Sequence, residues 1–196
     1  MKRIHKLNPN NAENWDKEWI KYLRKSGNSD KTHITGSEER FKYFGSKINA
    51  GDIILDLACG LSEFTQIMKK EKRVKAYGMD FSRFAMRKMK KITPGVNWVI
   101  GDVLKIPFRS RTFDAVIAGE TIEHFEKPGL LISEMERVTK IGGRMVLSTP
   151  HIYGYKYHLW VFKESDLMDL MKPFGDVEIK RVPDHYIVAC CTIKSS

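Results

Sequence analysis

The sequence predicts an α/β fold built on a mostly parallel sheet. The apolar run at 53–57 leads through small residues into a helix start near residue 64, and the order strand, helix, strand repeats through the middle of the chain. Crossovers of this kind produce parallel neighbouring strands. The chain has 196 residues, of which 42% are hydrophobic, so we expect one domain with one core.

Two amphipathic helices are predicted before the first strand. Their apolar side chains recur at helical spacing, in the first helix at Trp15, Trp19, Tyr22 and Leu23 and in the second at Phe41, Phe44 and Ile48. The first helix follows cap candidates at 10–11 and ends in the polar run 26–30, and the second begins near Ser37. These helices are expected either to cap a ligand pocket or simply to pack against the sheet.

The first strand leads into a tight turn and a helix start. Its apolar run ends in the carboxylate Asp56, and the small residues Ala58 and Gly60 follow, where the backbone must turn and let a ligand approach closely. A second carboxylate, Asp80, lies 20 residues after Gly60 and closes the next apolar segment. This spacing is expected when the second acid accepts both hydroxyls of a ribose, so the pattern predicts a nucleoside site.

The turn also narrows the class of nucleoside. It lacks the three glycines of a dinucleotide fingerprint, and Glu63 would place a like charge beside a pyrophosphate at the helix start. NAD and FAD are therefore disfavoured. A cofactor with a ribose but no phosphate fits better, and S-adenosyl-L-methionine is the common one, since its ammonium and sulfonium groups tolerate nearby carboxylates.

Two further motifs follow in order, at 101–108 and 113–124. With them, the chain resembles the type 11 group of class I S-adenosylmethionine-dependent methyltransferases from about Ile48 to the region of Met171. The resemblance implies a Rossmann-like fold with about seven strands, helices on both faces and an antiparallel hairpin at the carboxyl end. It also implies an enzyme that transfers a methyl group and releases S-adenosyl-L-homocysteine.

Turn residues and periodicity delimit the remaining elements. These are a helix from Pro128 to Val138, a turn at 142–143, a fifth strand at 144–149, a short helix at 164–171 and two strands at 177–182 and 186–192. The last two strands correspond to the antiparallel hairpin that the resemblance implies.

The resemblance assigns cofactor contacts residue by residue. The loop under the methionyl group and ribose corresponds to Asp56, Leu57, Ala58, Cys59 and Gly60, with Ser62 where the family usually has another glycine. The other positions are Asp80 for the ribose, Phe81 and Val103 beside the adenine, Asp102 for the adenine amino group, and Glu120 at the end of the fourth strand. An isolated aspartate at a strand end is more often a turn former, but in this ordered series Asp56, Asp80 and Asp102 are interpreted as ligands. Cys59 is interpreted as a small buried residue, not a nucleophile.

His124 and Glu123 follow the fourth strand, where a substrate pocket is expected to open. Methyl transfer requires a positioned acceptor and usually a base for its proton. An imidazole has an unperturbed pKa suited to that role, so His124 is the first candidate for the base, with Glu123 beside it. A structural role for His124 is the alternative.

The same segment permits a metal site. Glu120, Glu123 and His124 match a motif that small-RNA 2′-O-methyltransferases and ubiquinone-pathway O-methyltransferases use for a divalent metal. Two carboxylates and an imidazole suit Mg²⁺ or Mn²⁺, and a further imidazole would come from His151 or His158. Because the motif also occurs in type 11 relatives without a metal role, no metal is expected.

Aromatic residues and histidines are dense in the segment after the fifth strand, at 149–160. Loops at the carboxyl ends of parallel strands carry binding groups, so this segment is expected to hold the acceptor as a sugar, an aromatic ring or a splayed base. The expected contacts are His151, Tyr155, His158 and Trp160. Core packing of Tyr157 and Trp160 is the alternative.

The chain carries 34 basic and 24 acidic side chains, a formal net charge of +10. Much of the excess lies at 69–75 and 83–91, which predicts either a solvated face or a surface for nucleic acid or another polyanion. Three cysteines without ligand spacing, no cleavable leader and no membrane span of about 20 apolar residues indicate a reduced, cytoplasmic protein. The oligomeric state does not follow from the sequence.

A single domain is expected over 1–196, with a helical cap at 1–47, a cofactor-binding core at 48–150 and a substrate-side segment at 151–196. The first functional interpretation is methyl transfer from S-adenosyl-L-methionine to a small-molecule acceptor, most simply an oxygen of a sugar, a glycan or another metabolite. RNA methylation is the alternative, from the net charge and the metal motif. A non-catalytic cofactor-binding module is the third interpretation, and the intact cofactor acids argue against it.

Overall fold

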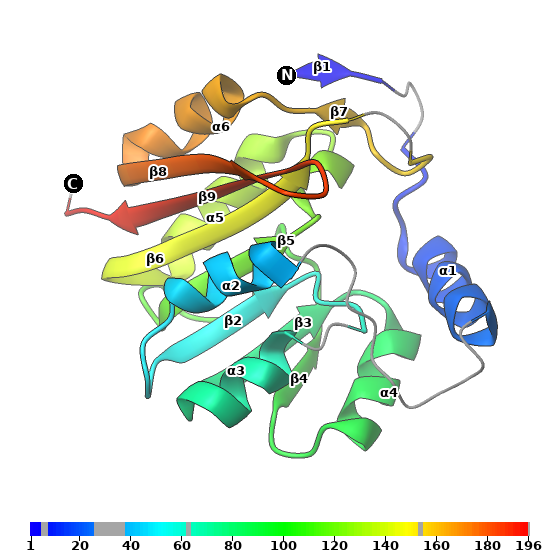
Figure 1. Cartoon of the computed structure of the whole chain (residues 1–196). Helices are drawn as coiled ribbons and strands as arrows, with labels where there is room; N and C mark the ends of the chain where they lie inside the picture. Colours follow the sequence, from blue (N-terminus) through cyan, green and yellow to red (C-terminus); the bar gives the residue numbers. More distant parts are fainter. Residues whose placement is uncertain (5–7, 26–37, 62–63, 153–154, 196) are drawn as a thin grey trace.

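Seven strands form the central sheet of the computed structural model, which describes residues 1–4, 8–25, 38–61, 64–152 and 155–195 (Figure 1). In the order in which they lie across the sheet, they are β4 (Asn97–Ile100), β3 (Lys75–Asp80), β2 (Ile53–Leu57), β5 (Phe113–Gly119), β6 (Thr139–Pro150), β9 (Tyr186–Ile193) and β8 (Gly175–Val182). Neighbours from β4 to β6 run parallel, whereas β9 is antiparallel to both β6 and β8. The predicted α/β fold with an antiparallel hairpin at the carboxyl end is confirmed.

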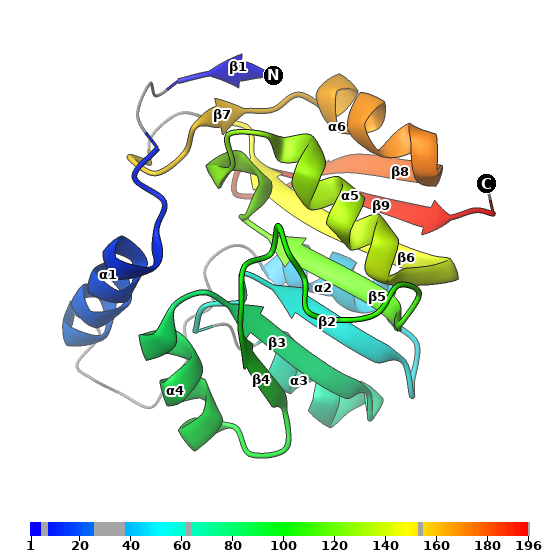
Figure 2. The same cartoon turned by 180° about the vertical axis from the view of Figure 1, so that it is seen from behind.

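Helices cover both faces of this sheet (Figures 1 and 2). The helices on the faces are α2 (Glu38–Ser46), α3 (Phe64–Lys72), α4 (Arg83–Ile92), α5 (Pro128–Val138) and α6 (Glu164–Met171), whereas α1 (Ala12–Lys25) lies beside the end of the sheet. Strand β2 shows why both faces need covering, because successive side chains of a strand point to opposite sides. Ile54 belongs to the apolar cluster formed with α2 and α3, and Leu55 belongs to the cluster formed with α5 and α6.

Helix α1 packs against α4 beside the carboxyl ends of the central strands (Figure 1). The Asp16 carboxylate of α1 accepts hydrogen bonds from the Ser82 hydroxyl at 2.5 Å and from the Phe84 backbone amide at 3.2 Å. Leu23 adds an apolar contact in the same cluster. The predicted end of the first helix, the predicted start of the second and the turn residues Ser62 and Glu63 lie outside the described residues.

Two details differ from the elements predicted from the sequence. Strand β6 already begins at Thr139, so 142–143 lies within it as an irregularity, where Gly142 has a φ of 74° and the pairing register with β5 shifts. A small second sheet pairs β1 (Lys2–Arg3) with β7 (Trp160–Val161). Within the described part of the chain, no helix is both long and apolar enough to span a bilayer.

Candidate functional site

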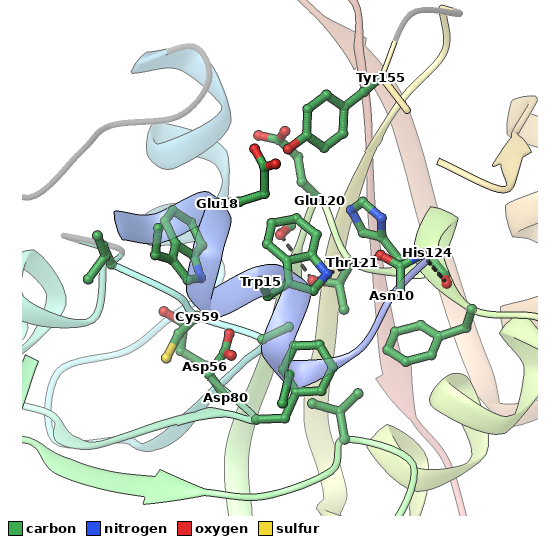
Figure 3. Close-up of a pocket in the computed structure, with 18 of the residues that line it drawn as sticks. Asn10, Trp15, Glu18, Asp56, Cys59, Asp80, Glu120, Thr121, His124 and Tyr155 are labelled. Carbon is green, nitrogen blue, oxygen red and sulfur yellow. Dashed lines mark hydrogen bonds between the residues drawn. The ribbon is translucent and has the colours of Figure 1, made fainter. Parts of the chain in front are cut away.

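A cavity of about 870 Å³ lies at the carboxyl ends of the parallel strands, between α1, α2 and the loops that follow the strands. Figure 3 shows Asp56 and Asp80 at one end and His124 at the other, with Trp15 drawn between them. The predicted site residues in its wall are Asp56, Ala58, Cys59, Asp80, Phe81, Asp102, Val103, Glu120, His124, Tyr155 and His158. Five other predicted site residues are described by the structure but do not line the cavity, namely Leu57, Gly60, Glu123, His151 and Trp160.

The loop after β2 brings its backbone close to the cavity. Ala58 and Gly60 have φ values of 50° and 51°, and the left-handed region is strained for any residue except glycine. A Cβ atom on Gly60 would lie 2.2 Å from the Trp19 ring of α1. Gly60 is therefore required both by the turn and by the close packing of α1 on the loop.

Asp80 joins this loop to the end of β3. Its buried carboxylate accepts hydrogen bonds from the backbone amides of Gly60 at 2.9 Å and Ser82 at 2.8 Å. A carboxylate offers about four acceptor positions, so capacity remains for donors in the cavity. Burial raises the pKa of Asp80 to about 6, against the lowering effect of these two amides.

Asp56 and Asp102 flank Asp80 in the cavity wall. Asp56 is buried and accepts a hydrogen bond from the Thr65 hydroxyl at 2.5 Å, while burial raises its pKa to about 7. Asp102 is exposed, and its carboxylate accepts a hydrogen bond from the Leu104 amide at 2.9 Å. Three carboxyl groups from three successive strand ends therefore meet in one cavity.

Glu120 is held by Arg40, which the sequence analysis did not single out. The Arg40 guanidinium is 3% exposed, donates to the Glu120 carboxylate at 2.5 Å and stacks over the Tyr186 ring at 4.7 Å. Glu120 has a φ of 51°, a strained value for a residue with a side chain. The strained backbone at the end of β5 and the ion pair together fix this carboxylate at the cavity wall.

His124 lies at the end of η1 (Ile122–His124), directly after β5. Its Nδ1 atom is 2.9 Å from the Tyr157 carbonyl oxygen, and its ring meets the His158 ring edge-on at 5.0 Å. Burial, with a smaller contribution from His158, lowers the pKa of His124 to about 3. The ring is therefore neutral at neutral pH, with Nδ1–H donating to Tyr157.

Glu123 lies behind His124 and is completely buried. One of its oxygens accepts a hydrogen bond from the Thr149 hydroxyl at 3.0 Å, and the other is 3.8 Å from Nε2 of His158. Burial raises the pKa of Glu123 to about 8, and the charge of Glu120 acts in the same direction. One ligand atom from each of Glu123, His124 and His158 lies within 4.8 Å of the other two.

Asn10 links the amino-terminal segment to this end of the cavity. Its side-chain amide donates to the carbonyl oxygens of His124 at 3.1 Å and Tyr157 at 2.9 Å, and it accepts a hydrogen bond from Trp15 Nε1 at 3.0 Å. The sequence analysis considered Asn10 only as a helix cap. In the structure, the neighbouring Asn11 accepts from the Asn14 amide at the start of α1, which leaves Asn10 for the cavity.

The four predicted acceptor contacts divide into two pairs. Tyr155 and His158 line the cavity. The His151 backbone amide donates to the His185 carbonyl oxygen at 2.9 Å, which turns the chain toward the β8–β9 hairpin. Trp160 belongs to β7 and donates through Nε1 to the Phe125 carbonyl oxygen at 2.8 Å, with Arg3 over its ring at 5.5 Å.

Residues 55–147 match a family model described as methyltransferase domain. A ubiquinone/menaquinone biosynthesis C-methyltransferase of Desulfotalea psychrophila is 32% identical, with 60% of this chain and 50% of that relative covered. A demethylmenaquinone methyltransferase of Streptomyces avermitilis is 38% identical, with 72% of this chain and 60% of that relative covered. The chain therefore spans 50% to 60% of the length of these two curated relatives.

A solved structure with the same fold is phosphoethanolamine N-methyltransferase 2 of Haemonchus contortus in complex with phosphomonomethylethanolamine and S-adenosylhomocysteine. Its TM-score is 0.73 at 14% sequence identity, with 92% of this chain and 58% of that chain covered. At this identity the likeness extends to the fold alone.

Proposed function

Because this chain belongs to the type 11 group of class I methyltransferases, we propose that it transfers a methyl group from S-adenosyl-L-methionine to a small-molecule acceptor. The observation that carries the proposal is the Asp80 carboxylate. It is buried, it accepts a hydrogen bond from Gly60 in the loop after β2, and it lines a cavity with room for a nucleoside and a second ligand. S-adenosyl-L-homocysteine would be the product.

The residues present fit this cofactor. Asp80 has acceptor capacity for the two ribose hydroxyls, and Asp102 lies at the neighbouring strand end, where it can accept from the adenine amino group. Phe81 and Val103 supply apolar surface beside it. Asp56 beside Asp80 and Glu120 at the end of β5 place two further carboxyl groups in the cavity wall, which suits the ammonium and sulfonium groups. The cofactor supplies a methyl group already activated on sulfur.

The remaining task of the chain is to position the acceptor and exclude water. His124 and Tyr155 line the cavity away from the buried aspartates, and Trp15 lies between the two ends. Asn10 is hydrogen-bonded to the His124 carbonyl oxygen and to Trp15 Nε1. We infer that His124 contacts the acceptor and that Glu123 supports it from behind. The aromatic rings favour a flat aromatic acceptor, and the two curated relatives are named for quinone biosynthesis. A sugar or glycan oxygen is the second candidate.

The test begins with calorimetric titration of the protein with S-adenosyl-L-homocysteine. We expect Asp80→Asn to weaken binding by roughly 10- to 150-fold, because hydrogen bonds to a charged acceptor contribute about 1.5–3 kcal/mol. The matched control is Asp176→Asn, an exposed aspartate paired with Lys194 on the edge strand, which should bind like the wild type. Equal affinities of the wild type and Asp80→Asn would remove Asp80 from the cofactor site.

Acceptor classes can then be compared with a labelled methyl donor. We expect label in phenols or quinols and none in saccharides or RNA. Label in a saccharide would support the alternative acceptor, and label in RNA would support an RNA methyltransferase. Cofactor binding without transfer to any acceptor would favour a regulatory module.

A further inference from the structure

From the buried group at the end of η1, we propose that Glu123, His124 and His158 form a site for a divalent transition-metal ion, with its open positions facing the acceptor end of the cavity. The three residues converge from two parts of the chain, two from the loop after β5 and one from the segment after β6. All three are buried, and one ligand atom of each lies within 4.8 Å of the others.

The Glu123 carboxylate supplies the strongest sign of a missing ligand. Among the described residues, none hydrogen-bonds to its Oε1 atom, although the side chain is fully buried. A buried acceptor without a hydrogen-bond partner destabilises a protein, because it has lost water and gained nothing in exchange. A cation bound to Oε1 would remove that cost, while Thr149 continues to satisfy the other oxygen.

The distance between Glu123 and His158 fits two ligands of one ion better than a hydrogen bond. Oε1 and Nε2 are 3.8 Å apart, which is too long for a hydrogen bond. In a tetrahedral zinc site, ligand atoms at about 2.0–2.1 Å from the metal lie roughly 3.3–3.5 Å from one another. A small rotation of either side chain therefore gives the separation that an ion requires.

His124 is already held as a metal ligand requires. Its Nδ1 lies 2.9 Å from the Tyr157 carbonyl oxygen, and a histidine that donates one ring nitrogen to a carbonyl presents the lone pair of the other. The Tyr157 carbonyl is itself fixed by the Asn10 amide. The tautomer and the ring orientation are therefore set before any ion binds.

The donor set differs from the one that the sequence motif suggested. Glu120 is engaged by Arg40 at 2.5 Å, so its carboxylate faces a cation already present in the protein. With His158 in place of Glu120 as the third ligand, the set consists of two imidazoles and one carboxylate. This set suits zinc and other first-row transition ions, whereas Mg²⁺ prefers oxygen ligands.

The open coordination positions would face the acceptor, since His124 and His158 line the cavity whereas Glu123 lies behind them. An ion held there can bind an acceptor oxygen and orient it, and this role rests on the proposed function. Binding of the ion itself does not depend on methyl transfer. Metal content and methyl transfer can therefore be measured separately.

The test is titration of the chelator-treated 196-residue chain with ZnCl₂, together with Co²⁺ as a spectroscopic probe of imidazole coordination. We expect one ion per chain, bound at least about ten-fold more weakly by Glu123→Gln and His158→Ala. Glu123→Gln keeps the shape and the Thr149 hydrogen bond, and retained binding of S-adenosyl-L-homocysteine shows that each variant is folded. MgCl₂ should bind more weakly than ZnCl₂.

The matched control is His185→Ala, because His151 and His185 form another imidazole pair, with ring centroids 5.8 Å apart. This variant should keep the ion and the Co²⁺ spectrum of the wild type. The proposal is overturned if the wild type binds no stoichiometric ion, if Glu123→Gln and His158→Ala bind like the wild type, or if only His185→Ala loses the ion. None of these outcomes would affect the cofactor titration.

Discussion

Two buried carboxyl groups, Asp56 and Asp80, lie where the proposed cofactor would meet the protein. An ionised carboxylate loses hydration when it is buried, and this raises their pKa values to about 7 and about 6. Hydrogen bonds from Thr65 to Asp56 and from two backbone amides to Asp80 offset part of the effect. Both groups therefore change charge within the range of pH in which ligand binding can be measured.

The affinity for S-adenosyl-L-homocysteine should consequently depend on pH. We expect it to rise about ten-fold between about pH 5 and 7, because ionised Asp80 is the better acceptor for ribose hydroxyls and its ionised fraction rises about ten-fold over this range. Calorimetric titrations at several pH values provide the measurement. In Asp80→Asn the part of the rise centred near pH 6 should be missing. An affinity that is constant or falls with pH in the wild type would contradict this coupling.

The sequence allowed some site residues to be predicted and not others, for a physical reason. Asp56 and Asp80 each end an apolar run, and the carboxyl ends of parallel strands meet at one edge of the sheet. The local sequence pattern was therefore enough to predict that both carboxylates lie in the site. The role of Arg40 depends on how α2 docks against the sheet, which no short motif encodes. His151 was expected at the cavity wall but does not line the cavity, and its backbone amide donates to the His185 carbonyl oxygen.

At the scale of elements, α1 packs closely against the loop after β2 at the cavity wall. Gly60 has a φ of 51°, and the Trp19 ring occupies the position that a side chain on Gly60 would need. Since Trp15 and Trp19 both line the cavity, a shift of α1 would open it. The position of α1 is therefore coupled to the conformation of a single glycine.

Gly60→Ala tests this coupling. We expect it to destabilise the protein by more than the roughly 1–2 kcal/mol of left-handed strain alone, because the added methyl group also displaces Trp19. In a Trp19→Ala background the same change should cost only the strain. Denaturant unfolding of the four proteins gives this double-mutant cycle. Equal costs in both backgrounds would mean that α1 does not press on the loop.

The alternation of strands and helices from β2 to α6 was predicted well, because it depends on periodicity over short segments. The pairing of β1 with β7 was not predicted. It joins Lys2–Arg3 with Trp160–Val161, and a strand of two residues is too short to show an alternation of apolar and polar side chains. Trp160 was expected either at the acceptor site or in the core, because it lies in an aromatic-rich segment. In the structure it belongs to β7, its Nε1–H donates to the Phe125 carbonyl oxygen, and Arg3 lies over its ring.

Basic side chains are concentrated on part of the molecule, on helices α1 and α4, which lie next to each other (Figures 1 and 2). Helix α4 contains no acidic residue, and its exposed face presents Arg87, Lys90 and Lys91. Helix α1 adds exposed Arg24 and Lys25 near its end. Such a surface attracts polyanions whether or not it has a biological partner, so binding alone does not distinguish the RNA alternative from a solvated face.

The salt dependence of RNA binding gives the last prediction. We expect the wild type to bind a single-stranded RNA weakly and to lose affinity steeply as the salt concentration rises. In a combined Arg87→Gln, Lys90→Gln, Lys91→Gln variant, the slope of log affinity against log salt concentration should be smaller by about 2. Fluorescence anisotropy at several salt concentrations measures both slopes. The variant should bind S-adenosyl-L-homocysteine like the wild type, because none of the three side chains lines the cavity within the described structure. An RNA that accepts labelled methyl from the wild type and not from the triple variant would instead show that this surface selects the acceptor.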